Sequence, residues 1–425
     1  MSQNKLKTLN TTRALIVDLL VKCNQGSYSN EIVPSTLAKS SFSPSDKALI
    51  TRVVYSTLRN QIRIDNAINK ISSKNTSKLD DLALNALRSI FGQLLEGFDM
   101  YAVLNETVKV MPFNLKGFVN GVSRKALKLD EEDKLFINET LSVKYSMPEW
   151  IVDEIKISFK NNVEEILKSL NSSGQVTLAP YKSVLPVNGK YTQGSLVEDS
   201  RVLTNARSVS DLDEIKNGTA LVVDQSSQYI INQLDVENKK VLDLCCAPGG
   251  KSFLMSQHAS NVVSVDLSIS RLSKMLDTKS RLKTTNIKIV SGDCLNLPFA
   301  EGTKFDVIYL DAPCSGLGVL RRRPDARNNI DKSIVDELSQ LQEKMLNAII
   351  GLLAPGGRLV YSVCTFTKSE TVDVIENFLS RNPQFESTQE NSSNGHVEPL
   401  KYGSLIIPGT ENDSMYYCQL QHKII

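Results

Sequence analysis

From Asn238 onward the chain alternates short apolar runs with longer helical stretches, and this alternation constrains the fold more than any other feature. The expected strands are Val241–Cys245, Val262–Asp266, Ile287–Ser291, Phe305–Leu310, Arg358–Ser362 and a final one at Met415–Leu420. Strands that alternate with helices predict a doubly wound parallel sheet with helices on both faces. We therefore expect residues 236–425 to form an α/β, Rossmann-like domain.

Residues 1–139 have the pattern of an all-α bundle. Ser43 can cap a helix that has Pro44 at its first position. A second apolar face repeats at helical spacing through Leu79, Leu82, Ala86, Ile90 and Leu94. A further helical stretch, Tyr101–Leu127, is expected to break near Pro112. Low strand content and this periodicity together favour a helical domain.

The middle residues, 140–235, have a mixed pattern. Pro148 can begin a helix that runs to about Leu170, and short β-prone pieces follow around 175–187 and 219–223. We expect a small α+β segment here. The chain is thus predicted to have three parts, at 1–139, 140–235 and 236–425.

The net charge of +2 hides an asymmetry between the two ends of the chain. Residues 1–128 hold 18 Lys and Arg against 9 Asp and Glu, which gives +9, whereas the remainder carries −7. A basic N-terminal third favours an anionic partner, most simply nucleic acid. A lysine-rich solvated helix surface would give the same composition, so charge alone leaves both interpretations open.

Several classes of protein are disfavoured by what the sequence lacks. It has no run of about 18 apolar residues, and Met1–Asn10 has no apolar signal core, so we expect a cytoplasmic protein that does not enter a membrane. The seven cysteines do not have the spacing of a disulfide scaffold. Without C-x-x-C or H-E-x-x-H, and with three histidines, no metal site is expected.

The run Val241–Lys251 predicts a strand, a glycine-rich turn and a helix. Ligands of open α/β sheets bind at the carboxyl ends of the strands, and Gly249 and Gly250 would let one approach the backbone. Asp266 ends the next strand, where a carboxylate can hold the two hydroxyls of a ribose. Asp293 follows the third strand and can accept a hydrogen bond from an adenine amino group.

The sequence of this turn favours some nucleoside ligands over others. It does not supply the G-x-G-x-x-G of a dinucleotide fold, and in a P-loop reading the first glycine would fall at Cys245. A phosphate cradle is therefore disfavoured. S-adenosylmethionine has a ribose and an adenine but no phosphate, which fits the remaining pattern; a tight structural turn without a ligand is the alternative.

Two cysteines follow neighbouring strands of the predicted sheet. The run Asp311-Ala312-Pro313-Cys314-Ser315-Gly316 comes after the fourth strand, and Val363-Cys364-Thr365 comes after the fifth. Both thiols should lie at the edge that carries the cofactor turn. A lone cysteine is most often a small buried hydrophobe, and we apply that interpretation to Cys23 and Cys418. For Cys314 and Cys364 the position favours nucleophilic chemistry.

These motifs resemble those of the bacterial ribosomal RNA cytosine-5 methyltransferases of the Sun/RsmB type. The run Ala247–Lys251 resembles the family's first motif, Asp311–Gly316 its fourth, and Cys364 falls in its sixth. The N-terminal region resembles the family's NusB-like RNA-binding domain through Ser43–Leu49 and Gly117–Asn120. Cys246 and Val363 depart from the usual alanine and threonine.

The resemblance implies roles for particular residues. Cys364 would be the nucleophile that attacks carbon 6 of cytosine, Cys314 would assist product release, and Asp311 would meet the charge on the ring nitrogen. S-adenosylmethionine would be held by Cys245, Cys246, Ala247, Pro248, Gly249, Gly250, Lys251, Asp266, Asp293 and Asp311. Small-subunit (16S) ribosomal RNA would be the substrate of a monomeric enzyme.

Three other functions compete with this one. A non-catalytic RNA-binding or antitermination factor would not need both cysteines and the aspartates Asp266, Asp293 and Asp311, which are present. DNA cytosine methyltransferases have an arrangement with a single cysteine, in the fourth motif. The second cysteine of this chain therefore favours RNA as the substrate. The catalytic motifs do not separate ribosomal from transfer RNA. The basic run Arg321–Arg323 suits RNA phosphates or a solvated loop equally.

Overall fold

The computed structural model describes residues 6, 10–204, 209–388 and 395–423, so most of the stretch Met1–Asn10 lies outside it. The chain packs into two compact units. The helical unit comprises Met1–Lys156 and Leu320–Asn329, and the sheet unit comprises Ile157–Val319 and Ile330–Ile425. Each is described by itself below.

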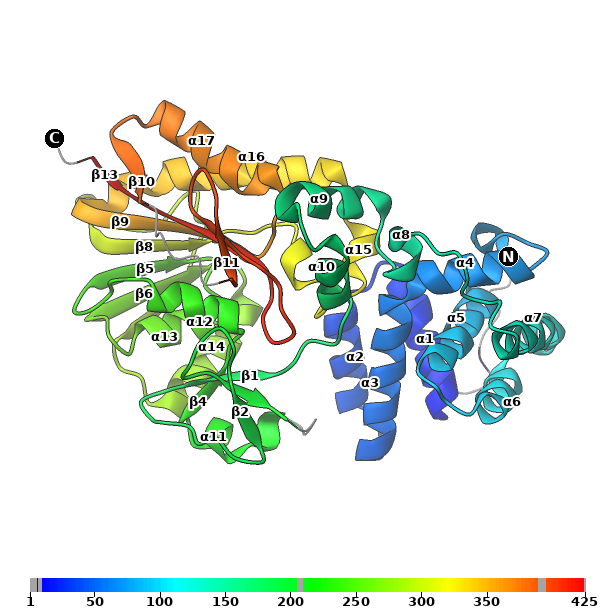
Figure 1. Cartoon of the computed structure of the whole chain (residues 1–425). Coiled ribbons are helices and arrows are strands. Elements are labelled where there is room, and N and C mark those ends of the chain that lie inside the picture. Colours follow the sequence, from blue (N-terminus) through cyan, green and yellow to red (C-terminus); the bar gives the residue numbers. More distant parts are fainter. Residues whose placement is uncertain (1–5, 7–9, 205–208, 389–394, 424–425) are drawn as a thin grey trace. The chain divides into compact units, whose positions relative to one another are not determined.

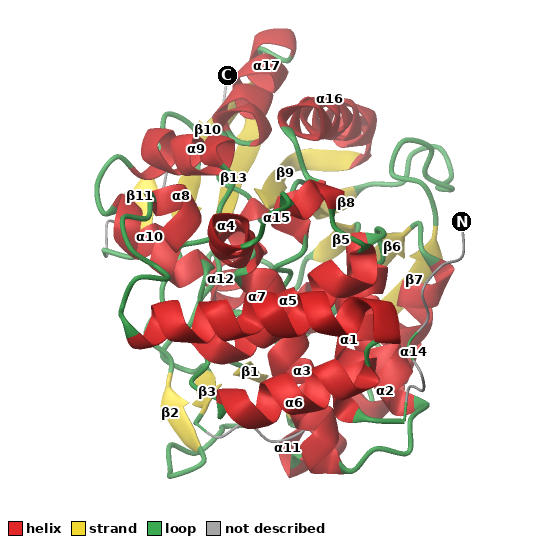
Figure 2. Cartoon of the chain, turned by 90° about the vertical axis from the view of Figure 1, so that its right-hand side faces the viewer, coloured by secondary structure: helices red, strands yellow, loops and turns green. Residues whose placement is uncertain are grey.

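The helical unit is built almost entirely from α-helices (Figures 1 and 2). They are α1 (Thr12–Asn24), α2 (Ser29–Ala38), α3 (Pro44–Arg59), α4 (Gln61–Ile71), α5 (Asp81–Leu95), α6 (Met100–Val110), α7 (Phe113–Glu131), α8 (Leu141–Lys144), α9 (Glu149–Phe159, at its boundary) and α15 (Ala326–Asn329), with a 3₁₀ turn at Thr76–Lys78. The predicted start of α3 is confirmed, since the Ser43 side chain accepts from the Asp46 N–H. The predicted break at Pro112 separates α6 from α7.

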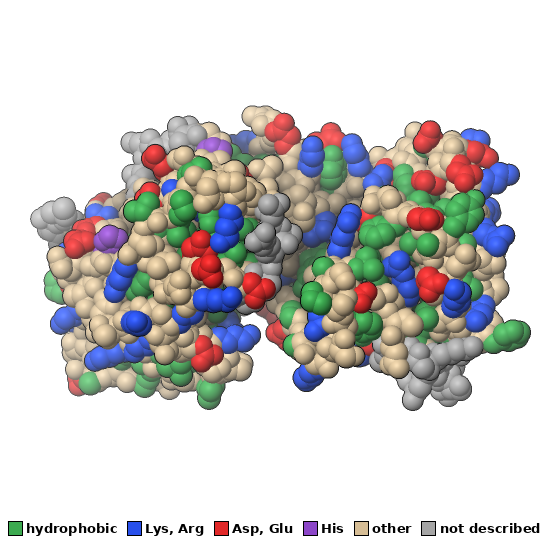
Figure 3. Space-filling view, turned by 90° about the horizontal axis from the view of Figure 1, so that it is seen from below, with side chains coloured by type: hydrophobic (Ala, Val, Ile, Leu, Met, Phe, Trp, Pro, Cys, Tyr) green, Lys and Arg blue, Asp and Glu red, His purple; other side chains and the backbone are tan. Residues whose placement is uncertain are grey.

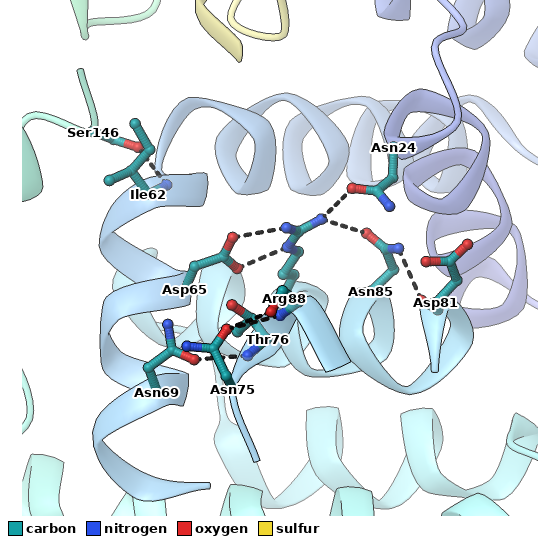
Figure 4. Close-up of polar contacts among 11 residues, drawn as sticks. Asn24, Ile62, Asp65, Asn69, Asn75, Thr76, Asp81, Asn85, Arg88 and Ser146 are labelled. Carbon is teal, nitrogen blue, oxygen red and sulfur yellow. Dashed lines mark hydrogen bonds and ion pairs between the residues drawn. The ribbon is translucent and has the colours of Figure 1, made fainter. Parts of the chain in front are cut away.

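Helix α5 is the centre of this unit, and it packs against α1, α3, α4, α6 and α7. Its buried cation, Arg88, donates to both oxygens of Asp65 at 2.8 and 2.7 Å (Figure 4). The same guanidinium donates to Asn24 Oδ1 at 2.8 Å. A charge that leaves water is tolerated only where such partners satisfy it. The network therefore ties α1 and α4 to α5.

The segment Leu320–Asn329 belongs to the helical unit although it follows the fourth predicted strand of the sheet. Arg327 is fully buried and donates to the carbonyl oxygens of Arg59 (3.1 Å) and Ser146 (3.0 Å). Asp325 accepts from the backbone N–H and the hydroxyl of Ser29, at the start of α2. The segment thus satisfies helix-end groups that would otherwise be orphaned.

This packing corrects the expectation for the basic run Arg321–Arg323. An RNA-binding loop and a solvated loop would both expose these arginines to solvent, yet the Arg321 side chain is only 1% exposed. Arg323 alone of the three is exposed. Since the run carries three consecutive charges, its composition gave no sign of this burial.

The sheet unit begins with the end of α9, α10 (Val163–Leu170) and a small antiparallel sheet of strand order β2-β3-β1-β4. Its strands are β1 (Thr177–Pro180), β2 (Tyr191–Gln193), β3 (Arg201–Leu203) and β4 (Ala220–Val222), accompanied by the short α11 (Asp213–Lys216, before β4) and by α12 (Gln225–Asn232). The single helix expected from Pro148 to Leu170 was wrong, because left-handed Lys160 and Asn162 separate α9 from α10. The expected strands near 177 and 220 are confirmed.

The large sheet has the order β11-β12-β13-β9-β8-β5-β6-β7, with β10 paired to β13. Its strands are β5 (Lys240–Leu244), β6 (Asn261–Asp266), β7 (Ile287–Ser291), β8 (Phe305–Asp311), β9 (Leu353–Val363), β10 (Phe385–Thr388), β11 (Val397–Pro399), β12 (Ser404–Ile406) and β13 (Met415–His422). The five strands from β7 to β9 are parallel, as expected, and β10 to β13 add antiparallel pairs. The result is a Rossmann-like sheet with an antiparallel extension.

Helices cover both faces of the large sheet (Figure 1). Helices α13 (Gly250–Met255) and α14 (Ile269–Leu282) lie against one face, and α16 (Lys332–Ile349) and α17 (Val372–Arg381) against the other. From the middle residues, α12 adds Tyr229, Ile230 and Ile231 to the apolar core of this sheet. Residues 157–235 therefore pack with the large sheet in one unit. Within the described part of the chain, none of the helices is long and apolar enough to cross a membrane.

Candidate active site

The parallel strands end together at one edge of the large sheet, and the predicted site residues follow those ends. In the register of β8 and β9, Asp311 lies opposite Ser362. The turn that follows β5 leads into α13, and Asp266 is the last residue of β6. The edge therefore holds the first, fourth and sixth motifs side by side, where ligands of such sheets bind.

The two cysteines are brought into contact at this edge. The Sγ atoms of Cys314 and Cys364 lie 3.3 Å apart, and both residues are half-buried. The hydrogen bond to Cys364, burial, and the negative charges of Cys364 and Glu370 raise the pKa of the Cys314 thiol well above its ordinary value. Cys314 therefore keeps its proton, and its thiol can donate to the Cys364 sulfur across this contact.

Asp311 is held in place by two neighbours. The Lys251 ammonium donates to its Oδ2 at 2.6 Å, and the Ser362 hydroxyl donates to its Oδ1 at 2.9 Å. Burial by itself would lower the pKa of Lys251, but the charge of Asp311 raises it above the ordinary value, so the ammonium stays charged. The carboxylate is thus held in a fixed orientation beside a charged ammonium, at the sheet edge that also carries the cysteines.

A cavity of about 210 Å³ opens beside this ion pair. Six predicted cofactor residues line it: Cys246, Ala247, Pro248, Gly250, Lys251 and Asp311. The other four, Cys245, Gly249, Asp266 and Asp293, do not line it. Asp243 and the segment Val222–Asp224 with Ser227 complete the lining, and sequence reasoning did not single these out.

The cradle fits a nucleoside cofactor in its local geometry. Gly249 has φ +98°, and a Cβ there would come within 2.8 Å of the Met275 side chain. Asp243 is fully buried, and its Oδ1 has no hydrogen-bond partner among the described residues, which leaves an acceptor at the cavity. Burial raises the pKa of Asp243 to about 7. The glycine is thus required by packing against Met275, and the unused Asp243 oxygen is the feature that a bound polar ligand would satisfy.

Asp266 and Asp293 extend the site along the same edge. Asp266 is 4% exposed, and its carboxylate accepts from the N–H groups of Ala247 (3.0 Å) and Ser268 (2.9 Å). Asp293 is exposed just beyond β7 and accepts from the Leu295 N–H at 2.9 Å. The two carboxylates therefore follow adjacent strands, at increasing distance along the sheet from Asp311. Their assignment to ribose and adenine stays a prediction.

Cys23 and Cys418 behave as the sequence analysis expected of buried hydrophobes. Cys23 and Cys418 are 5% and 0% exposed. Burial raises the pKa of each of these two thiols to about 12. Among the described residues there is no group of three or more His, Cys, Asp or Glu side chains arranged to hold a metal ion.

Two known families match the chain, one over its sheet-containing part and one over its N-terminal helices. Residues 231–421 match the family described as 16S rRNA methyltransferase RsmB/F, and residues 10–128 match the NusB family. The ribosomal RNA small subunit methyltransferase B of Citrobacter koseri is 30% identical over 441 residues, covering 99% of this chain and 100% of that protein. The probable ribosomal RNA small subunit methyltransferase B of Bacillus subtilis is 29% identical, covering 88% of this chain and 90% of that protein.

Two solved structures share the fold. The crystal structure of PH0851 is 21% identical with a TM-score of 0.78, and the match covers 98% of this chain and 100% of that one. The structure of NSun6 from Pyrococcus horikoshii with SFG is 17% identical with a TM-score of 0.56, covering 65% and 98%.

Proposed function

The chain belongs to the ribosomal RNA small subunit methyltransferase B family, and from that premise we propose that it transfers a methyl group from S-adenosylmethionine to carbon 5 of a cytosine in small-subunit ribosomal RNA. The observation that carries the proposal is the 3.3 Å contact of two cysteine sulfurs at the sheet edge that also holds the cofactor motif. Carbon 5 of cytosine is a poor nucleophile, and a thiolate that adds to carbon 6 makes it reactive.

The first half of the reaction uses Cys364 and Asp311. The target base is flipped out of its stack, and the Cys364 thiolate forms a bond to carbon 6. Cys314, which keeps its proton, stabilises that thiolate beforehand across the 3.3 Å contact. As the thiolate adds, the ring nitrogen takes up a proton from water, and the resulting N–H donates to the Asp311 carboxylate, which Lys251 and Ser362 hold in place. The cofactor supplies the methyl group that carbon 5 then takes.

The second half must free the enzyme from the RNA. Carbon 5 still carries its original proton, which a base removes while the bond between carbon 6 and Cys364 breaks and the thiolate leaves. Once Cys364 is a thioether, its negative charge no longer raises the pKa of Cys314, so the Cys314 thiol can pass its proton to water and become the thiolate that accepts the carbon 5 proton. Cys314 is the group we assign to this step, acting directly or through a water.

Bisulfite sequencing of total RNA tests this function. In cells with the gene, one cytosine of small-subunit ribosomal RNA should resist conversion, and in cells without it the same cytosine should convert. Protection of a transfer RNA cytosine instead would favour the alternative substrate. No change in any RNA would favour a non-catalytic RNA-binding or antitermination role.

We predict that Asp266→Asn weakens binding of S-adenosylmethionine about 10-fold or more. A charged hydrogen bond contributes about 1.5–3 kcal/mol, and each 1.4 kcal/mol is about a factor of ten. Titration calorimetry measures the change. Asp277→Asn, an exposed carboxylate on α14, is the matched control and should bind normally. Equal affinities would place the ribose elsewhere.

We also propose that the helical unit supplies RNA affinity, on the basis of the +9 charge of residues 1–128. On the face that Figure 3 shows, Lys and Arg side chains of this unit are interspersed with acidic and hydrophobic ones. Arg124 and Lys128 are both carried by α7, and Arg124 is exposed. Phosphate contacts release counterions, so binding should weaken steeply with salt.

Replacing Arg124 and Lys128 by alanine should weaken binding to ribosomal RNA. It should also reduce the slope of log affinity against log salt by about one for each phosphate that is no longer neutralised. Filter binding over a salt series measures both quantities. Lys240→Ala, an exposed cation at the opposite end of β5 from the site, is the control. If Lys240→Ala had the larger effect, RNA would bind the sheet unit. Monomeric state and cytoplasmic location stay predictions.

A further inference from the structure

Glu370 is a fully buried carboxylate that the proposed mechanism does not use. It ends a 3₁₀ turn (Lys368–Glu370) six residues after Cys364 and just before α17. Burying a carboxylate costs free energy unless hydrogen bonds replace its water. The hydrogen-bond partners of Glu370 therefore indicate the role of this buried carboxylate.

The partners of Glu370 come from the segments of both cysteines. One oxygen accepts from the Ser315 N–H at 2.8 Å, and the other accepts from the Ser315 hydroxyl at 2.5 Å. That second oxygen also accepts from the hydroxyls of Thr365 (3.2 Å) and Thr367 (2.9 Å). Ser315 directly follows Cys314, and Thr365 directly follows Cys364.

Further contacts hold the carboxylate itself in place. Gln342 of α16 donates to it at 3.2 Å, and the Tyr361 hydroxyl of β9 donates to the Glu370 carbonyl at 2.7 Å. The hydroxyls of Ser315 and Thr365 lie 2.9 Å from each other. The two cysteine-bearing segments, 50 positions apart in the chain, are thus both hydrogen-bonded to the Glu370 side chain. Gln342 and Tyr361 in turn hold Glu370 in place.

We propose that Glu370 is a positioning residue that clamps the Cys314 segment against the Cys364 segment, and that the release of methylated RNA depends on this clamp more than the initial attack does. The inference rests on the proposed function. Two of the four bonds from the cysteine segments come from Ser315, so loss of the carboxylate loosens the Cys314 segment most. Gln342 still donates to the Pro313 carbonyl at 2.9 Å, and the Gly318 N–H still donates to the Cys364 carbonyl at 3.0 Å. Cys364 also remains attached to β9, and Asp311 keeps Lys251 and Ser362.

The negative charge of Glu370 has a second effect, on the thiol it positions. It is among the causes that raise the pKa of Cys314, after the Cys364 hydrogen bond, burial and the charge of Cys364. Replacing Glu370 by glutamine keeps the shape of the side chain and an oxygen acceptor but removes the charge. The pKa of Cys314 should therefore fall in that variant.

The test compares Glu370→Gln with the wild-type protein in single-turnover and steady-state methylation of ribosomal RNA. Steady-state turnover should fall about 10²-fold, the effect of a small misplacement of reacting groups, while the first turnover changes far less. A denaturant-resistant protein–RNA complex should accumulate on a gel. The KM for S-adenosylmethionine should stay unchanged. Glu376→Gln, a carboxylate on α17 paired with Lys401, should behave as the wild type.

A second variant and a second measurement separate positioning from folding. Ser315→Ala removes one hydroxyl donor to Glu370 and should accumulate the same complex to a smaller extent, and its effect should not add to that of Glu370→Gln. In a Cys364→Ala background, Glu370→Gln should make Cys314 react with iodoacetamide at lower pH. A merely structural residue would move neither readout.

The outcomes distinguish this inference from the function on which it rests. If folded Glu370→Gln released product at the wild-type rate, the clamp would be refuted while the covalent mechanism stood. If turnover fell only in proportion to a loss of folded protein, Glu370 would be structural alone. If the wild-type protein itself formed no covalent complex and modified no cytosine, the proposed function would fail first.

Discussion

Cys364→Ala is expected to abolish methylation of ribosomal RNA and to form no covalent complex with it. Without the thiolate the bond to carbon 6 never forms, so carbon 5 is never activated. The loss should be on the order of 10⁴-fold or more in kcat, as for other covalent nucleophiles. Single-turnover methylation with labelled cofactor measures the rate, and a denaturing gel detects the complex.

Two controls show that this loss is chemical. Binding of S-adenosylmethionine should survive in Cys364→Ala, because the cavity lining does not include Cys364. Cys418→Ala, which removes a fully buried thiol from the neighbouring β13, should keep its activity apart from some loss of stability. An active Cys364→Ala protein would eliminate the covalent mechanism in the form proposed here.

The central strands β5, β6, β8 and β9 could be predicted because most of their residues are buried, which makes them nearly continuous apolar runs, whereas β10, β11 and β12 were not predicted. The run Ile287–Ser291 has the observed bounds of β7. By contrast, β9 begins at Leu353, five residues before the prediction, because Leu353 already pairs with Phe305 of β8; the Pro-Gly-Gly sequence that follows lies in a register shift before pairing resumes at Arg358. The three-residue strands β2 and β3 are too short to show a period.

Local signals also failed where tertiary packing decided the outcome. The chain between α9 and α10 has neither glycine nor proline, yet Lys160 and Asn162 adopt positive φ there. Arg321 is buried although it begins a run of three arginines. The sequence at Arg321 has a solvent-exposed pattern that packing within the helical unit overrides, and the sequence at 160–162 has a helical pattern that the positive φ values interrupt.

Some residues of the candidate site could also be predicted from the sequence, and others could not. Residues at strand ends could be predicted, since parallel strands present their carboxyl ends at one edge. Ser362 and Glu370 could not, because they act through contacts with Asp311 and Ser315, more than 50 positions away. Asp224 and Ser227 line the cavity from a segment with no recognised motif. The sequence thus indicated the groups proposed to react and missed those that hold them.

Cys314→Ala is expected to fail in a different way from Cys364→Ala. The variant retains the nucleophile and Asp311 with its two hydrogen bonds, so attack and methyl transfer should still occur. Removal of the carbon 5 proton should slow, and general acid–base groups contribute about 10²–10⁴-fold to such steps. Steady-state turnover should fall by that factor, while one methyl group per enzyme is still transferred.

The diagnostic observation is accumulation of a denaturant-resistant complex that contains both the methyl label and the RNA. Because Cys314 is 3.3 Å from Cys364, it also stabilises the attacking thiolate, so the first turnover should slow somewhat, but far less than release. Cys314→Ser, which restores a proton-carrying group of nearly the same size, should shorten the lifetime of the complex relative to Cys314→Ala. If Cys364→Ala trapped the RNA and Cys314→Ala did not, the roles of the two sulfurs would be exchanged, as in a one-cysteine mechanism with the fourth-motif thiol as nucleophile.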